Sequence, residues 1–292
     1  MSGAAQATLL ADGRRLYLQH GPIDLIIAAD GARAEVEAAY RQAWAAFTPV
    51  LADLVDELSL LRRPVEAEAI AVEGPVAQRM VDACRPHAAL FITPMAAVAG
   101  AVADHVLAAM LEGRHLKRAY VNNGGDIALF LAPGTCFEIG IVPSLAAPRI
   151  AAVATIAAAS PVRGVATSGQ GGRSLSCGIA DAVTVLARSG AQADAAATLI
   201  ANAVDIDSRV IERQPANTVV EDTDLGALPV VTAVGALTAA EVESALDAGR
   251  AVASDMRERG LIAAAYLHLR GRQRLVGAPL PVLRQEQRGQ AA

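Results

Sequence analysis

The stretch YVNNGGDIAL, residues 120–129, places two asparagines, two glycines and an aspartate between runs of strand-forming residues. Nothing in residues 122–126 is suited to packing a core, although the chain as a whole is strongly apolar. Side-chain amides, a carboxylate and bare backbone N–H groups can hydrogen-bond a polar ligand, and glycine lets that ligand approach closely. We therefore predict that residues 122–126 contact a polar ligand.

On either side of this stretch, apolar periodicity predicts helices and strands without a regular βα repeat. Thr93 is placed to cap a helix that begins at Pro94. The predicted pattern is a single α+β unit over residues 1–292, with a ligand cleft between two lobes and a disordered tail at about 284–292. Strands are predicted at 15–31 (a hairpin), 88–93, 136–142, 149–157, 164–168, 181–187, 261–270 and 273–277, and helices at 32–44, 48–61, 74–84, 94–113, 191–204 and 238–258.

The composition limits the partners. Hydrophobic residues make up 53% of the 292 positions but aromatic residues only 3%, so alanine, valine and leucine must fill the core. Chains of this kind often hide apolar surface in a homodimer, which we expect here. A formal net charge of −5 gives no excess positive field for a phosphate backbone, so nucleic acid is not an expected partner.

Compartment and membrane contact follow from similar observations. The three cysteines are far apart and odd in number, which fits a reduced cytoplasm better than a disulfide framework. The longest uncharged run, residues 88–103, is shorter than a bilayer span of about 20 residues and contains Pro94 and Gly100. We therefore predict a cytoplasmic protein without a membrane segment or an export signal.

A second polar stretch, TSGQGGRS at residues 167–174, combines hydroxyls, three glycines and an arginine. Such a composition can surround phosphate oxygens with N–H donors and a guanidinium. The stretch is neither a P-loop nor a dinucleotide-binding fingerprint, because it lacks the terminal Gly-Lys-Ser/Thr and has Ser174 where the third glycine belongs. A flexible surface turn is the alternative reading.

Asp194 and Thr198 are four residues apart in a predicted helix and so lie on one face. A carboxylate and a hydroxyl there could hold a hard cation such as Mg²⁺. The alternative is that Asp194 favours the helix dipole and Thr198 merely packs. Asp104 and His105, adjacent on another helix, point in directions about 100° apart, and we assign them to solvent and packing.

Three motifs, VNNGGDIAL, GVATSG and ADAAAT, occur in an order and spacing that resembles the ApbE superfamily of flavin-handling proteins. Longer segments are similar to the UPF0280 branch of that superfamily, and the resemblance covers most of residues 16–277. The segments are ELSLLRRPV, TPMAAVAGAVAD, YVNNGGDIAL, ATSGQGGRSLSCGIADAVTVLA and ADAAATLIANAV.

ApbE enzymes bind FAD in a cleft and, with Mg²⁺, transfer FMN to a threonine of a target protein or hydrolyse FAD. The resemblance implies an ApbE-like α+β fold here, with FAD or a related flavin and Mg²⁺ as cofactors. It implies that Asn122, Asn123, Gly124, Gly125 and Asp126 face the dinucleotide, that Thr167, Ser168, Gly169 and Arg173 lie at its phosphates, and that Asp194 and Thr198 hold the cation.

The chain departs from the transferases at one segment. Where they carry His-x-Ile-Asp-Pro-x-Thr-Gly, this chain reads GRSLSCGIAD, and the histidine is missing. Arg173, Ser174 and Ser176 are the candidate catalytic residues, but serine is a poor general base without a partner. FMN transfer is therefore not expected.

Two classes of function follow for this small-molecule site. The first is a Mg²⁺-dependent enzyme that binds FAD or a related phosphorylated cofactor and hydrolyses it. The second is a protein that holds a flavin, or another fused heteroaromatic such as a pterin, without chemistry. The missing histidine favours the second, while Asp194 and Thr198 favour the first.

Overall fold

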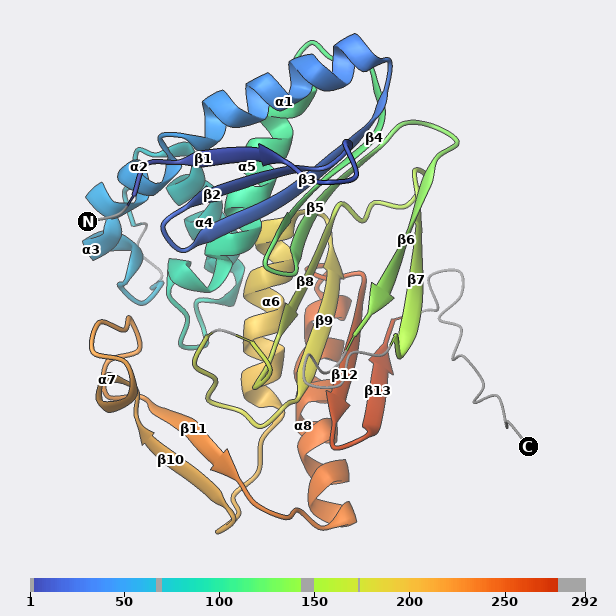
Figure 1. Ribbon diagram of the computed structural model, residues 1–292. Coiled ribbons are helices and arrows are strands. Elements are labelled where there is room, and N and C mark those ends of the chain that lie inside the picture. The colour runs from blue at the N-terminus through green and yellow to red at the C-terminus, as the bar shows by residue number, and fades with distance from the viewer. Residues whose placement is uncertain (1–2, 67–69, 143–149, 173, 278–292) are drawn as a thin grey trace.

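The computed structural model describes residues 3–66, 70–142, 150–172 and 174–277. Arg173 and the predicted tail at about 284–292 lie outside these residues. One large antiparallel sheet carries helices on one face and a hairpin on the other (Figure 1). Helices segregated to one face of an antiparallel sheet define an α+β architecture, so that prediction is confirmed.

Nine of the described strands form the large sheet, and every neighbouring pair is antiparallel. Chain neighbours are sheet neighbours except where β5 meets β8 and β9 meets β12. In spatial order the strands are β1 (Gln6–Leu9), β2 (Leu16–His20), β3 (Ile23–Gly31), β4 (Leu116–Asn123), β5 (Asp126–Leu131), β8 (Gly164–Ser168), β9 (Ala182–Ala187), β12 (Ala264–Leu269) and β13 (Arg272–Val276).

The helices α5, α6 and α8 pack on the sheet, and α1 and α4 pack on α5 (Figure 1). Alternating strand residues such as Leu25, Ile27 and Val185 are buried against this helical layer. The helices are α1 (Arg33–Phe47), α2 (Val50–Asp56), α3 (Leu58–Leu61), α4 (Pro75–Cys84), η1 (Arg85–His87), η2 (Pro94–Ala97), α5 (Val98–Leu111), α6 (Gly190–Ala203), α7 (Ala216–Val219) and α8 (Ala239–Glu258).

Two hairpins stand apart from the large sheet. The first, β6 (Cys136–Ile141) with β7 (Ala152–Ala157), covers the outer face, where Ile156 joins a buried cluster with Leu129 and Val165. The second, β10 (Ile211–Pro215) with β11 (Pro229–Val234), forms an arm that carries α7.

The α5 and α6 helices approach each other unusually closely. A Cβ on Gly100 would lie 2.2 Å from the carbonyl oxygen of Gly190, so only glycine fits at this position. Asp104 of α5 accepts hydrogen bonds from the N–H groups of Gly190 (2.8 Å) and Ala191 (2.9 Å), which caps α6. The assignment of Asp104 to solvent and packing therefore missed a helix-capping role.

Some element predictions were wrong. Residues 88–93 are not a strand; Leu90 and Phe91 are exposed, and no described strand pairs with this run. The Thr93 side chain does not cap the next helix but donates its hydroxyl proton to Asp224. The strands β1, β10 and β11 and the short helix α7 were not predicted.

The segment Pro94–Leu111, which combines η2 and α5, is 18 residues long with a mean hydropathy of 1.5. By length and composition alone it could cross a bilayer. Half of it is buried inside the protein, and α5 contacts α1, α4, α6, β4 and β5. This is the position of a core helix, and core helices can also be long and apolar enough to cross a bilayer.

Candidate functional site

The hairpin between β4 and β5 positions the asparagines and glycines of the opening stretch. Asn123 pairs with Asp126, and the two residues between them, Gly124 and Gly125, have φ of +65° and +117°. Two consecutive positive φ angles make glycine the natural choice for this tight turn. The Asn122 Oδ1 atom accepts a hydrogen bond from the Gly125 N–H (2.8 Å), so Asn122 braces the turn.

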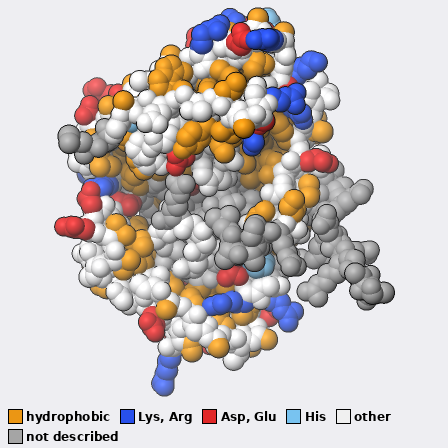
Figure 2. All heavy atoms as spheres, viewed as in Figure 1, with side chains coloured by type: hydrophobic (Ala, Val, Ile, Leu, Met, Phe, Trp, Pro, Cys, Tyr) orange, Lys and Arg blue, Asp and Glu red, His pale blue; other side chains and the backbone are white. Residues whose placement is uncertain are grey.

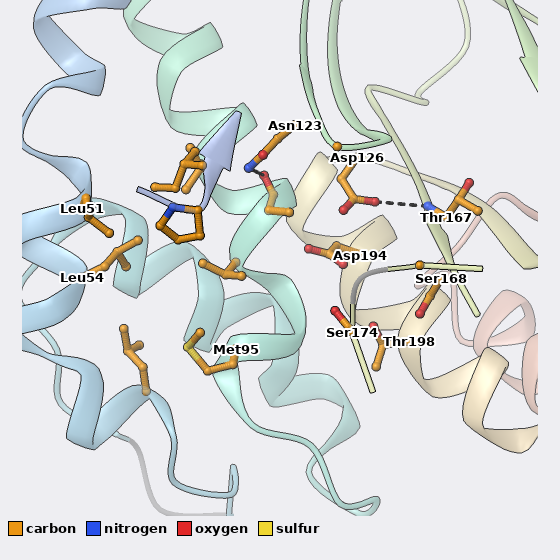
Figure 3. A pocket seen from close by; sticks show the side chains of 18 of the residues that line it. Leu51, Leu54, Met95, Asn123, Asp126, Thr167, Ser168, Ser174, Asp194 and Thr198 are labelled. Carbon is orange, nitrogen blue, oxygen red and sulfur yellow. Dashed lines mark hydrogen bonds between the residues drawn. The ribbon is translucent and has the colours of Figure 1, made fainter. Parts of the chain in front are cut away.

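Asn123 and Asp126 point from this hairpin toward the helical layer (Figure 3). Asn123 donates from Nδ2 to the Ala99 carbonyl (3.1 Å), which ties the turn to the start of α5. Asp126 is partly buried, and its Oδ1 accepts a hydrogen bond from the Thr167 N–H (3.1 Å) on β8. Burial raises the pKa of Asp126 to about 7, although the Thr167 bond opposes that shift.

Asp194 reaches the same space from the first half of α6. Its Oδ2 accepts a hydrogen bond from the Gly100 N–H (3.0 Å). Burial, and then the nearby charge of Asp126, raises the pKa of Asp194 well above its ordinary range. Thr198 lies one turn further along α6, and Figure 3 shows these side chains gathered with Ser174 around one space.

Two cavities meet at these side chains. The first, of about 460 Å³, has an apolar wall from α2, α3 and η2 (Figure 3). The second, of about 620 Å³, extends toward the segment 220–228, which connects α7 to β11 and which we call the strap. Both cavities are lined by Met95, Val98, Ala99, Asp126, Ser174, Asp194 and Thr198.

The charge at this junction is negative. Asp126 and Asp194 line both cavities, and Asp222 and Asp224 of the strap line the second. Within the described part of the chain, neither lining includes a lysine, an arginine or a histidine. An anionic ligand therefore needs added positive charge at this point.

The structure brings many of the predicted site residues together. Ser168 and Gly169 line the first cavity beside Thr167 and Gly124, and Ser174 lines both cavities.

Three residues that were predicted to belong to the site line neither cavity. Asn122 and Gly125 line neither cavity. Ser176 is buried and also lines neither cavity; its hydroxyl donates to the Gly178 carbonyl (3.1 Å) and lies 3.4 Å from the amide oxygen of Asn202, a residue that lines the second cavity. This position suits a loop brace, so the geometry offers no catalytic role for Ser176.

Sequence reasoning missed the leucine wall and the strap. Leu51, Leu54 and Leu58 were predicted to lie on a helix, but amphipathic spacing does not distinguish a core face from a cavity wall. The strap is anchored by Arg62, which donates to both carboxylate oxygens of Asp222 (2.6 and 2.9 Å), and by the Thr93 bond to Asp224. No local pattern connects residues so far apart in the sequence.

The donor chemistry at the junction fits Mg²⁺. Two carboxylates and the hydroxyls of Thr198 and Ser174 are hard oxygen ligands, which this ion prefers. Among the described residues no three or more His, Cys, Asp or Glu side chains are grouped to hold a metal ion. A cation at this site would therefore depend on hydroxyls, water or ligand oxygens, as Mg²⁺ commonly does.

Residues 7–275 match the family model described as "AbpE bacteria". The chain belongs to this family. It is also similar to UPF0280 proteins, with 38% identity over 139 residues to the one from Methanothrix thermoacetophila and 40% over 134 residues to the one from Methanosphaerula palustris. These matches cover 47% and 45% of this chain, and 56% and 54% of the relatives. The predicted UPF0280 and ApbE-like family is confirmed, although the chain spans little more than half the length of these relatives.

Two solved structures are also similar to this member of the family. An apo flavinyl transferase ApbE from Pseudomonas stutzeri shares 14% identity at a TM-score of 0.44, with 94% of this chain and 95% of that chain covered. A flavin transferase ApbE from Vibrio cholerae shares 13% identity at a TM-score of 0.42, with 96% and 99% covered.

Proposed function

We propose that the protein binds FAD, or a related phosphorylated heteroaromatic cofactor, together with Mg²⁺ in the two joined cavities. The observation that carries this proposal is the convergence of Asp126 and Asp194 where an apolar cavity meets a polar one. A flat ring suits the leucine-lined cavity, since ligand sites are largely apolar with a few convergent polar groups. Membership of an ApbE-like family supports the same class of ligand.

The carboxylates explain why a cation would be required. Phosphate oxygens brought near Asp126 and Asp194 would be repelled by either carboxylate in its ionised form, at low effective dielectric. Mg²⁺ supplies positive charge against both the carboxylates and the phosphates. Asp194 and Thr198 would hold the cation, and the backbone of residues 167–169 would lie along the phosphates. Arg173 is proposed to contribute a guanidinium there.

The chemistry that these side chains would support is slow hydrolysis of the pyrophosphate. A water oxygen would form a bond to phosphorus while the bridging P–O bond breaks, which gives FMN and AMP. Asp126 would accept the proton released by that water, since a carboxylate with a pKa near neutrality is suited to general base catalysis. Transfer of FMN to a threonine is not expected, because the histidine of the transferase segment is missing.

The variant Asp194→Asn tests the binding proposal. The amide keeps the shape of the side chain and can still accept from the Gly100 N–H, so the fold should be retained. It removes one negative charge, and we expect Mg²⁺-dependent FAD affinity to fall by about 100-fold, or roughly 2.7 kcal/mol. Titration calorimetry with and without Mg²⁺ measures this effect.

The matched control is Asp53→Asn, which removes an exposed carboxylate from α2 outside both cavities. Riboflavin, which has no phosphate, is the matched ligand. Its affinity should be insensitive to Mg²⁺ and to Asp194→Asn. Equal Mg²⁺ dependence of FAD binding in the wild type and in Asp194→Asn would refute the proposed cation site.

The second candidate is a binding protein for a flavin or pterin without chemistry. It is favoured by the position of Ser176, whose hydroxyl bonds the Gly178 carbonyl and which lines neither cavity. Incubation with FAD, Mg²⁺ and a threonine-containing acceptor peptide separates the alternatives. AMP release without a labelled peptide supports hydrolysis, a labelled peptide supports transfer, and neither product with retained binding supports the second candidate.

A further inference from the structure

A third cavity, of about 260 Å³, lies at the end of the sheet near the β1–β2 turn. It shares no lining residue with the two cavities at Asp126. Its walls come from the β1–β2 turn, β3, β4 and β6, which converge at the upper end of the sheet in Figure 1. The lining residues are Asp12, Arg14, Arg15, Ala28, Ala29, Asp30, Arg118, Tyr120 and Phe137.

Two aromatic rings form part of the wall. Tyr120 and Phe137 meet edge to face with their ring centroids 6.0 Å apart. The Arg118 guanidinium lies over the Phe137 ring, with its central carbon 5.2 Å from the centroid. In a chain with 3% aromatic residues, two rings at the wall of one cavity give it a distinctive surface for a flat ligand.

The arginines retain unused donors. Arg15 bonds Asp12 through Nε (2.5 Å), and Arg118 bonds Asp30 through Nε. In both pairs the carboxylate contacts Nε. Arg118 also donates from Nη1 to the Cys136 carbonyl (3.2 Å), and Arg15 also hydrogen-bonds the Tyr120 side chain, but each guanidinium has further terminal N–H groups for another acceptor. Three guanidiniums face two carboxylates here, so the cavity is locally positive in a chain of net charge −5.

Arg14 is the least engaged of the three arginines. Its backbone is fixed, because its N–H donates to Asp12 (2.9 Å) and its carbonyl accepts from the Tyr40 hydroxyl (2.5 Å). Across the described residues, its guanidinium has no hydrogen-bond or ion-pair partner. The free guanidinium can form a bidentate contact to an anion, and because the backbone is already held, only the exposed side chain must be ordered.

We propose that this third cavity binds a phosphate monoester carried on a single aromatic or heteroaromatic ring. Arg14 contacts the phosphate, helped by the terminal N–H groups of Arg15 that Asp12 and Tyr120 do not use, and the ring lies against Tyr120 and Phe137. The volume suits a one-ring ligand, because it is below the range of about 300–1,000 Å³ typical of drug-sized sites. This site is independent of the proposed flavin site.

The test is titration calorimetry with phenyl phosphate, and with inorganic phosphate and phenol as its separate halves. EDTA is present throughout, so that the proposed cation site does not contribute. We expect phenyl phosphate to bind at least about tenfold more tightly than either half, because ring and anion contacts act together. Arg14→Ala should weaken phenyl phosphate binding about tenfold.

Arg14→Ala leaves both backbone hydrogen bonds of this residue available, so an unchanged melting temperature is expected as the folding control. Arg33→Ala removes the same charge from an exposed site on α1 and should not change the affinity. Phe137→Leu should weaken phenyl phosphate but not inorganic phosphate. Equal affinities for phenyl phosphate and phosphate, no saturable binding at about 10 mM, or binding insensitive to Arg14→Ala would each overturn the proposal.

Discussion

Asp126 and Asp194 face each other across a shared space with no described basic side chain beside them. Placing two carboxylates in such a position destabilises the fold, because like charges repel and burial disfavours the ionised form. The partners that offset this cost are backbone N–H groups of Thr167 and Gly100. At the scale of single residues, the fold is therefore least favourable in free energy where a cation is proposed to bind and would offset the repulsion.

This arrangement predicts a pH dependence of stability. The pKa of Asp126 in the folded protein is raised above its unfolded value, so folding stabilises the protonated form. That stability is present below the unfolded pKa near 4 and is lost as the pH rises toward about 7. We expect the free energy of unfolding to fall by roughly 1–3 kcal/mol between pH 5 and pH 8 without Mg²⁺.

Asp126→Asn is the variant that isolates this effect in urea unfolding series at several pH values. The amide oxygen can still accept from the Thr167 N–H, while the group no longer titrates. The variant should show a smaller decline in stability between pH 5 and pH 8, and the part that remains belongs largely to Asp194, whose pKa is also raised. A decline of the same size in Asp126→Asn would assign the pH dependence to other groups.

At the scale of elements, the β4–β5 hairpin depends on Asn122. The Asn122 side chain contacts the Gly125 N–H and lines neither cavity. Asn122→Ala should therefore destabilise the fold by about 1 kcal/mol, the usual net value of one hydrogen bond, while FAD affinity changes less than about threefold. Asn122→Asp, which keeps the acceptor, is the matched control, and thermal unfolding with parallel titration measures both quantities.

This expectation reverses the interpretation of Asn122 from the sequence as a ligand contact. The sequence placed this stretch between two strand-forming runs, which the structure confirms as β4 and β5, but Gly-Gly at such a position also makes a tight hairpin turn. It could not separate the residue that makes the turn from the residue that faces the cavity. That difference depends on which side of the sheet each side chain occupies.

The predictions of helices and strands were right for long segments with a clear apolar pattern. They were wrong where a partner strand, far away in the sequence, decides whether a segment forms a strand. The helices α1, α5, α6 and α8 agree with helices predicted from the sequence, and the hairpin of β2 and β3 was predicted from leucine and β-branched residues on both sides of a turn. Residues 88–93 read as a strand because an apolar run of six residues fits strands as well as loops. They have no partner strand among the described residues, and Leu90 and Phe91 line the second cavity instead.

The candidate site was predictable only in part. Motifs located Asp126, Thr167, Asp194 and Thr198, which the fold brings together from β5, β8 and α6. The strap could not be predicted, because its anchors pair residues about 130 and 160 positions apart with no shared local pattern.

At the scale of the whole molecule, the strap joins the arm to the N-terminal helices. Arg62 contacts both carboxylate oxygens and the carbonyl of Asp222, whose side chain is 80% exposed. Arg62→Ala should lower the free energy needed to open the strap by about 1 kcal/mol, as exposed ion pairs typically contribute. Amide hydrogen exchange in residues 220–228 should become about fivefold faster.

Arg63→Ala is the control for this variant, because it removes the same charge at the next position, where the side chain is exposed. Exchange in the strap should be unchanged in that variant, and exchange in α6 should be unchanged in both. If Arg62→Ala leaves strap exchange as slow as in the wild type, the Thr93 bond to Asp224 is the dominant anchor.

Figure 2 shows the basic side chains of the face in view mainly near its upper and lower ends, and acidic side chains between them along the left edge. On this face there is no continuous basic stripe of the kind that tracks a nucleic acid backbone. The absence of a nucleic-acid partner, like the homodimer and the cytoplasmic location, stays a prediction.

The close contact between Gly100 and Gly190 limits movement between the two halves of the large sheet. The large sheet has its shortest strand pairing between β5 and β8, where Ile127 pairs with Val165 and Ala128 with Gly164, and the Leu129 N–H donates to the Arg163 carbonyl (2.8 Å) next to them. We call this short pairing the seam. With so few hydrogen bonds across it, the strands β1–β5 on one side and β8, β9, β12 and β13 on the other would be able to rotate relative to each other. The α5 helix packs on β4 and β5, the α6 helix packs mainly on β8 and β9, and the backbone contact between the two helices spans this seam. Because the two helices cannot slide past each other, they fix the distance between the two halves of the sheet. The site residues on β5, β8 and α6 therefore keep their relative positions before any ligand binds.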